Sequence, residues 1–411
     1  MTPFCDRDCQ DPSRMALRAS AVRILGLLVV PILSGCGESA DPDAWQVSVE
    51  IVDGRTVVHN PSRGLWNRQE ELCIVEDLRL GTLDGDSPEL FGVITAISVS
   101  GQGDIAILDG QAREVRLFDR EGAHLATFGR SGEGPGEFQG PTAVHFDPLG
   151  RIWVVDARAS VYHLFASDGL FVRAHRRDPS AGVIVGYPGA VAADGFFDPA
   201  LHVGPDRRVG RLYVRIDTTG AVADTLPPVV EIHRTFDDLL PAGLSPYIPR
   251  IISAPERGGD TWVASTDQYT VYRRSAVGDT ILEIRVDSEE RRLSAEQEDT
   301  VRAVIDRFDS PVAPPVDRRA ARVGWQFLRS LHSDDDGRLF VRPMIETFEG
   351  QDRLFDVFDV EGRYLGRIES DFDVGNRPPP TFTGGHVYAA SEDEFGAPLM
   401  IRGEIRRCQD P

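Results

Sequence analysis

The sequence predicts an all-β fold, a six-bladed β-propeller with four-stranded blades, and three observations support this prediction. Short apolar strands separated by glycine turns begin near Leu80 and continue to the end of the chain. Two copies of this pattern start 47 residues apart, a length that suits four short strands and their turns. The glycines that open a strand bring the number of copies to six, and they are Gly103, Gly150, Gly195, Gly259, Gly337 and Gly385.

The first two copies match each other closely. Segments 103–109 and 150–156 each predict a strand that ends in Asp, and each is followed by a second strand and a further glycine. Those glycines, Gly122 and Gly169, are again 47 residues apart. Each copy therefore predicts alternating strands and turns, the organisation of one propeller blade.

The two ends of the folded region are expected to complete the ring. Residues 47–60 predict a β-hairpin, because Asp53-Gly54 between alternating strands favours a tight turn. The last blade stops after three strands, near Val387, Met400 and 404–406. Because a bare strand edge invites aggregation, we expect residues 71–80 to supply the missing strand and close the ring.

One segment interrupts the β pattern. Ser294-Ala-Glu-Gln297 is a capping-box signature, and Val301, Val304, Ile305 and Phe308 follow at helical spacing. We expect a short amphipathic helix within an insertion at about 288–312. It either packs against a blade edge or forms a lid or docking surface over one mouth of the channel.

The N-terminal segment has the features of an export signal. Arg18 and Arg23 precede an apolar stretch that is too short to span a bilayer, and residues 1–14 lie before this signal, which favours a start at Met15. Leu33-Ser-Gly-Cys36 resembles the lipobox of bacterial lipoproteins. This resemblance implies a signal peptide over 1–35, lipidation of Cys36, a tether over 36–44 and a propeller over 45–411.

The same signal predicts the cellular location of the protein. A lipidated Cys36 implies attachment to the cell envelope, facing the periplasm or the cell surface. Gly37, in place of Asp, favours the outer membrane. This compartment oxidises thiols, so we expect a disulfide between Cys73 and Cys408, which lie near the two ends of the folded region.

Composition excludes several functions. The formal net charge is −21, and nucleic-acid binding requires a basic surface, so we expect no nucleic-acid partner. All 44 basic residues are Arg. Schiff-base lysines, phosphate-loop lysines and Ser-x-x-Lys nucleophiles are therefore excluded as well.

Segment 128–138 resembles an NHL-type repeat. The positions that continue the match are Pro141, Asp147, Gly150 and Val154-Val-Asp156. With the lipobox and the early hairpin, residues 45–407 resemble six-bladed propeller lipoproteins of bacteria. Only the first two copies carry the motif in full, and the resemblance implies a fold and a binding role rather than a reaction.

Two motifs suggest ligands but are better explained as turns. Gly132-Glu-Gly-Pro-Gly136 has Pro and Glu where a phosphate cradle needs bare amides, and it is expected to be an inter-blade loop. Three adjacent carboxylates, 334–336, lack the alternate spacing of a calcium loop. We predict no metal site, no cofactor and no catalytic residue.

Two histidines are candidate ligand-binding residues. His145 and His332 each lie five residues before a strand-opening glycine, at one register of an innermost strand, where other blades have residues such as Ser98 and Pro380. Innermost strands surround the channel in which propellers bind ligands. The alternative is that both side chains pack between neighbouring blades.

Two functions remain open at this point. The first is a non-catalytic module that binds an unidentified protein or small ligand and is held on the membrane by its lipid. The second is a metal-dependent hydrolase or lyase centred on the channel, similar to lactonases or to the NHL lyase. The scarcity of convergent His and carboxylate residues favours the first.

Overall fold

The computed structural model describes eleven stretches of the chain, all within the compact unit Trp45–Pro411. They are residues 46–66, 71–83, 85, 87–177, 183–184, 189–203, 209–226, 250–288, 292–307, 326–344 and 351–408. The expected signal peptide, the lipidation site Cys36 and the tether lie outside the described residues.

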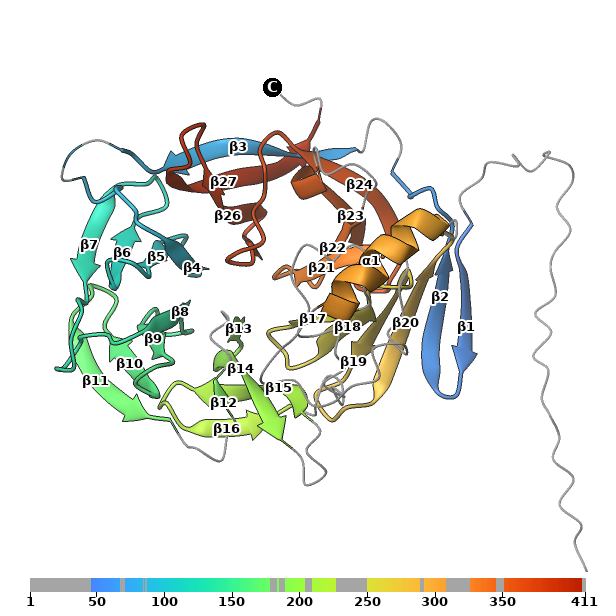
Figure 1. The fold of residues 1–411 in the computed structure, drawn as a ribbon. Coiled ribbons are helices and arrows are strands. Elements are labelled where there is room, and N and C mark those ends of the chain that lie inside the picture. The colour runs from blue at the N-terminus through green and yellow to red at the C-terminus, as the bar shows by residue number, and fades with distance from the viewer. Residues whose placement is uncertain are drawn as a thin grey trace, which may run out of the picture. The chain divides into compact units, whose positions relative to one another are not determined.

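Apart from one α-helix and one short 3-10 turn, the regular secondary structure of the described residues is all β-strand, which confirms the all-β prediction. Their sheets stand around a common centre, the arrangement of a β-propeller (Figure 1). Two antiparallel four-stranded sheets come first along the chain. One contains β4 (Ile94–Val99), β5 (Ile105–Asp109), β6 (Glu114–Phe118) and β7 (His124–Phe128). The other contains β8 (Pro141–Phe146), β9 (Ile152–Asp156), β10 (Val161–Phe165) and β11 (Phe171–Arg176).

The remaining strands form three larger sheets. One contains β12 (Val183–Ile184), β13 (Ala190–Ala192), β14 (Gly195–Val203), β15 (Val209–Asp217) and β16 (Val222–Thr225). The next runs from β17 (Ile251–Pro255) through β18 (Thr261–Ser265), β19 (Thr270–Arg274) and β20 (Thr280–Val286) to β2 (Arg55–Asn60) and β1 (Ser48–Val52). The last, in spatial order, is β21 (Leu328–Ser333), β22 (Leu339–Pro343), β23 (Leu354–Phe358), β24 (Tyr364–Ser370), β3 (Leu72–Leu80), β27 (Pro398–Arg407), β26 (His386–Glu392) and β25 (Thr381–Thr383).

Burial explains why the strands within one sheet differ in sequence. The second strands β5, β9 and β22 are buried along their whole length, and each begins with an apolar run such as Ile-Ala-Ile-Leu. The outer strands β7 and β11 are mostly exposed and more polar. The core lies between neighbouring sheets. One cluster, for example, joins Leu108 and Val115 to Val144 and Phe165 of the next sheet.

The N-terminal segment runs along the outer edges of three consecutive groups of strands, and we call residues 48–66 and 71–80 the belt. Its hairpin turns at Asp53-Gly54, where both residues have positive φ, and β2 then pairs in parallel with β20. The backbone nitrogens of Leu65 and Trp66 bond to carbonyls of β24. Gly64 allows this close approach, since a Cβ there would lie 2.4 Å from Gly366 Cα.

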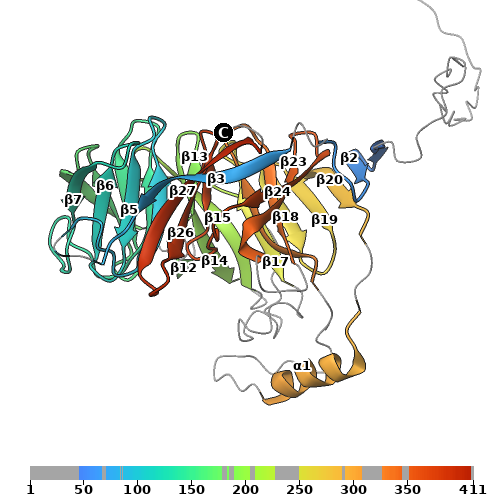
Figure 2. The ribbon, with the colours of Figure 1, turned by 90° about the horizontal axis from the view of Figure 1, so that it is seen from above.

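The belt ends in β3, which lies between β27 and β24 (Figure 2). It pairs antiparallel with β27 from Leu72 to Leu80 and in parallel with Glu369 and Ser370 of β24. Residues 71–80 thus occupy the outer edge of the last group of strands, where the sequence analysis placed them.

The sequence-based division of that last group is wrong in one respect. Met400 and residues 404–406 were expected in separate strands, but both lie in the single strand β27. Gly403 had suggested a turn, yet it sits in mid-strand, where the register against β3 shifts. A Cβ at Gly403 would lie 2.5 Å from Ile74 Cγ2, so this glycine serves close packing. The innermost strand of the group is β25, which precedes β26.

A disulfide joins Cys73 of β3 to Cys408, with their Cα atoms 5.0 Å apart and a sequence separation of 335. The backbone nitrogen of Cys408 also donates to the carbonyl of Glu71, at 3.0 Å. The bond therefore fixes the end of the chain to the belt.

Helix α1 (Ala295–Arg307) belongs to no sheet. Its capping box is complete, because Gln297 N donates to Ser294 Oγ at 3.2 Å and Ser294 N donates to Gln297 Oε1 at 2.9 Å. Val301 is buried, whereas Phe308 lies outside the described residues. Nothing in the described part of the chain forms a helix with the length and apolar character that crossing a membrane requires.

Candidate functional site

Two cavities lie at opposite ends of the innermost strands. The larger pocket, about 990 Å³, is lined by residues at the starts of β4, β17 and β21. The smaller pocket, about 190 Å³, is lined by residues at the ends of the same strands. Both sites are therefore built from several sheets at once, as ligand sites at the centre of a ring must be.

The structure brings His145 and His332 to the same smaller pocket. They share a register, since His145 faces Trp153 of the neighbouring strand and His332 faces Phe340. In the last sheet the equivalent position is Thr381, which faces Tyr388, and not Pro380 as the sequence spacing suggested. The two-glycine turn at 384–385 accounts for this difference of one residue.

Both histidines are buried and neutral at pH 7. His145 stacks on Phe196 with the ring centres 4.9 Å apart, and its Nε2 has no hydrogen-bond partner. Burial lowers the pKa of His145 to about 4. His332 Nε2 lies 2.8 Å from Ser330 Oγ, and burial together with the charge of Arg342 lowers the pKa of His332 to about 3. These imidazoles therefore accept a proton only near pH 3 to 4, far below neutral pH.

The carboxylates near the smaller pocket are used in internal contacts. Asp334 accepts hydrogen bonds from the backbone nitrogens of Asp336 and Arg338, which closes the β21–β22 turn. Asp335 pairs with Arg257 at 2.9 Å and accepts a bond from Thr383. Within the described stretches, no three His, Cys, Asp or Glu side chains gather closely enough to hold a metal ion.

The glycine-rich loop at 132–136 is likewise occupied by its own contacts. Glu137 Oε2 accepts a hydrogen bond from Gly134 N at 2.8 Å, and Arg130 donates to the other carboxylate oxygen at 2.7 Å. Phe138, which follows, is buried between two sheets. The loop is a connection between neighbouring sheets, as expected.

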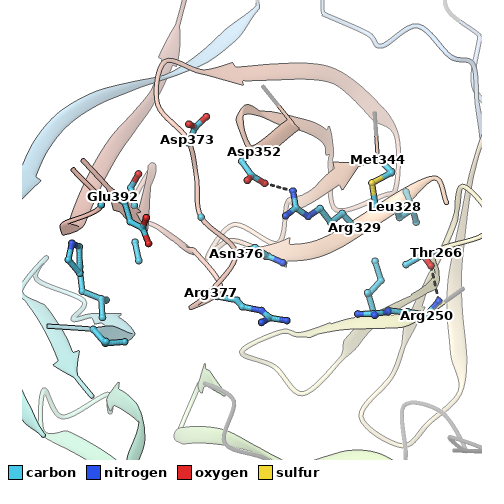
Figure 3. Close-up of a pocket in the computed structure, with 18 of the residues that line it drawn as sticks. Arg250, Thr266, Leu328, Arg329, Met344, Asp352, Asp373, Asn376, Arg377 and Glu392 are labelled. Carbon is cyan, nitrogen blue, oxygen red and sulfur yellow. Dashed lines mark hydrogen bonds and ion pairs between the residues drawn. The ribbon is translucent and has the colours of Figure 1, made fainter. Parts of the chain in front are cut away.

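The larger pocket was not predicted from the sequence, and its lining contains six charged side chains. Three cationic and three anionic side chains line it, and they are Arg250, Arg329, Arg377, Asp352, Asp373 and Glu392 (Figure 3). Several of these charges are already neutralised inside the protein. Asp352 pairs with Arg329 and with Arg342, and Asp373 pairs with Arg353 at 2.7 Å.

Arg342 positions one wall of this pocket. Its side chain is fully buried and donates to Asp352 Oδ1 at 2.8 Å and to the carbonyl of Val374 at 2.7 Å. Its guanidinium also lies over the Phe355 ring, 4.8 Å from the centre. Burial lowers the pKa of Arg342 to about 10, so it stays charged at neutral pH. The loop 371–380, between β24 and β25, is thereby held in place.

Three polar side chains on this pocket have no hydrogen-bond or ion-pair partner among the residues that the structure describes. Asn376 and Arg377 lie on the loop 371–380, and Glu392 ends β26. In Figure 3, Arg377 extends in the direction of Arg250, whereas Glu392 lies on the side away from it. These groups are free to contact a ligand. Because they belong to no repeat motif, the sequence alone had no pattern that could mark them.

Comparison with known proteins gives distant structural similarity only. No family model and no curated protein matches the chain. An exported protein from Bacteroides fragilis is 12% identical, over 85% of this chain and 99% of that one, with a TM-score of 0.44. A streptogramin B lyase is 12% identical, over 83% and 100% of the two chains, with a TM-score of 0.41. A gluconolactonase from Xanthomonas campestris is 13% identical, over 77% and 88%, with a TM-score of 0.39. Identities this low transfer neither an activity nor a ligand to this chain.

Proposed function

We propose that this chain is a lipid-anchored, six-bladed β-propeller of the cell envelope that binds a ligand in its larger pocket without changing it chemically. In this proposal each group of four strands is one blade. The eight-stranded sheet then holds two blades, β21–β24 and the group β25, β26, β27 and β3. The belt strand β3 would close the ring.

The observation that carries the binding role is the larger pocket itself. A cavity of about 990 Å³ suits a small ligand, and binding pockets typically combine apolar walls with a few well-placed polar groups. Ile94, Ile252 and Leu328 supply apolar wall, while Asn376 and Arg377 supply polar groups with no partner in the described protein. The salt bridges of Asp352 with Arg329 and with the buried Arg342 hold these groups in a fixed frame, which lowers the entropy cost of binding.

A pair of matched variants tests the binding site. Val93 lines the larger pocket and is 51% exposed, so Val93→Trp should fill the pocket without disturbing the core. Leu149, 68% exposed at the β8–β9 turn, offers Leu149→Trp as the control. The protein would be purified from its own membranes in mild detergent, and the small molecules released on denaturation would be measured by mass spectrometry. We expect one molecule in stoichiometric amount from the parent and the control, and its loss from V93W. Equal recovery from all three proteins would contradict the proposal.

The anchor is tested separately. Lipidation at Cys36 is motivated by the Leu33-Ser34-Gly35-Cys36 run, and an oxidising compartment is consistent with the Cys73–Cys408 bond. We expect Cys36→Ser to move the protein from the membrane fraction to the soluble fraction. If the variant still sediments with membranes, the lipoprotein assignment is wrong.

A second candidate function places chemistry in the smaller pocket. The unpartnered Nε2 of His145 favours it, because a neutral buried imidazole can bind a metal ion. Elemental analysis of protein purified without chelator tests this candidate. Stoichiometric zinc, calcium or iron that disappears in His145→Phe would favour the hydrolase or lyase over the binding module.

A further inference from the structure

We infer that the larger pocket binds a zwitterion, a molecule with a carboxylate at one end and an ammonium group at the other, of the short-peptide class. This inference rests on the proposed binding function of the pocket. It goes further by naming the ligand chemistry, which the uncommitted side chains of the pocket define.

The first step separates the charges that are used from those that are free. Asp352 accepts bonds from Arg329 and Arg342, and Asp373 accepts one from Arg353. Arg377 and Glu392 make no ion pair or hydrogen bond with any residue that the structure describes, and both are exposed to solvent in the pocket. Among the described residues of the pocket, Arg377 and Glu392 are therefore the charged side chains without a partner.

The positive side of the pocket suits a carboxylate. A guanidinium presents a planar fork that bonds both oxygens of a carboxylate, and such charge-assisted bonds are stronger than neutral ones. Arg377 extends in the direction of Arg250, whose charge adds to the same positive region (Figure 3). The neighbouring side-chain amide of Asn376 adds a further donor. Because the loop 371–380 is held by Arg342, these groups need little reordering on binding.

The negative side suits an ammonium group. Among the described residues no cation pairs with Glu392, which lies to the side of Arg377 that faces away from Arg250 (Figure 3). A purely anionic ligand would leave Glu392 unneutralised, and a purely cationic one would leave Arg377 unneutralised. A zwitterion neutralises both.

The size and the rim of the pocket favour a short peptide over a free amino acid. About 990 Å³ is the upper end of the range for small-molecule sites. Phe395, which precedes the lining residue Gly396, is 78% exposed, and Val93 on the wall is 51% exposed. These apolar groups would contact apolar peptide side chains between the two charged ends.

Equilibrium dialysis of the full mature protein in detergent tests the inference. The probe is a pool of tripeptides built from Ala, Leu and Phe, prepared with free termini, with an acetylated N-terminus, with an amidated C-terminus, or with both ends blocked. We expect peptides with free termini to be retained about tenfold more than either singly blocked form, because each lost charged contact costs about 1.4 kcal/mol. Doubly blocked peptides should not be retained.

Two variants connect each end of the peptide to one residue. In Arg377→Gln the preference for a free carboxylate should vanish while the preference for a free amine remains, and Glu392→Gln should do the reverse. Arg158→Gln and Glu121→Gln, exposed on outer loops, are the matched controls and should behave as the parent.

The outcomes distinguish the inference from the function on which it rests. If peptides are retained whichever end is blocked, or if R377Q weakens all four forms equally, the zwitterion is wrong and binding stands. The same holds if no peptide is retained but a molecule sensitive to V93W is recovered from the purified protein. If neither peptides nor such a molecule are found, both the inference and the proposed function fail.

Discussion

The buried histidines make the stability of the protein sensitive to acid. Burial keeps the pKa of His145 at about 4 in the folded protein, against about 6.5 in an unfolded chain. At pH values between these two pKa values, His145 is therefore protonated in the unfolded state but not in the folded state. Stability is fully present above about pH 6.5 and falls as the pH drops toward about 4. One pKa unit corresponds to about 1.4 kcal/mol, so His145 alone is expected to remove about 3 kcal/mol.

Replacing His145 with Phe should flatten this pH dependence. The ring stacked on Phe196 is kept, and Nε2 has no partner to lose. Urea unfolding at steps between pH 7.5 and 4 would measure the free energy of unfolding of both proteins. We expect H145F to lose about 3 kcal/mol less than the parent over this range. His124→Asn, at an exposed position of β7, is the control. Parallel curves for parent and H145F would contradict the assignment.

At the scale of residues, the sequence predicted the site residues that lie within the repeated strands, and it did not predict those that lie outside them. His145 and His332 were recognisable because each occupies one register of a repeated strand, and they do share a pocket. Asn376, Arg377 and Glu392 come from a loop and a strand end of different hairpins. Their meeting depends on how the sheets are placed in space, and no local spacing records that placement.

The N-terminal cap of helix α1 is a feature that the local sequence determines. Substituting Ser294 by Ala removes the acceptor of Gln297 N, a change that typically costs about 1 kcal/mol of helix stability. Since α1 belongs to no sheet, the melting temperature of the protein should not move. We expect hydrogen exchange of the first-turn amides of α1 to accelerate about fivefold, as 1 kcal/mol implies. Thr300→Ala, in the same helix, should not accelerate exchange, because Ala is the better helix former. Unchanged exchange in S294A would show that the cap does not hold this helix.

At the scale of elements, hairpins were predictable and their long-range partners were not. The capping box and the Asp53-Gly54 turn are local signals, and both elements form where they were expected. The parallel pairing of β2 with β20 was not foreseen, because backbone pairing at a sheet edge leaves little trace in side-chain pattern. Gly403 was misinterpreted for a related reason. The sequence does not distinguish a glycine that allows close packing within a strand from a glycine in a turn.

For the whole molecule, the Cys73–Cys408 bond should contribute substantially to stability. It closes a loop of 335 residues, and chain entropy for so long a loop predicts a stabilisation of more than about 4 kcal/mol. The double variant Cys73→Ser, Cys408→Ser should therefore unfold at lower urea, with a free energy of unfolding reduced by about 4 kcal/mol. The parent protein in reductant should match the variant. A difference below about 1 kcal/mol would show that the pairing of β3 with β27 holds the ends without the bond.

The repeat predicted the arrangement of the sheets, whereas the location of the protein and its ligand depend on features outside the repeat. The repeated strand pattern predicted a ring of sheets around a common centre, and the structure shows this arrangement. The lipid at Cys36 and the outer membrane stay predictions, since the leader lies outside the described residues. The ligand is a proposal because binding depends on side chains that face one another across the ring.

The disulfide also changes what a protease can do to this protein. Between Cys73 and Cys408 the backbone and the bond form a covalent macrocycle. A single cut anywhere in that circle opens it into a linear chain, but it releases no fragment. The two pieces stay joined through sulfur and through the paired strands β3 and β27. A nicked molecule would keep its full mass until a reductant is added, and the strands around both described pockets would stay in one molecule.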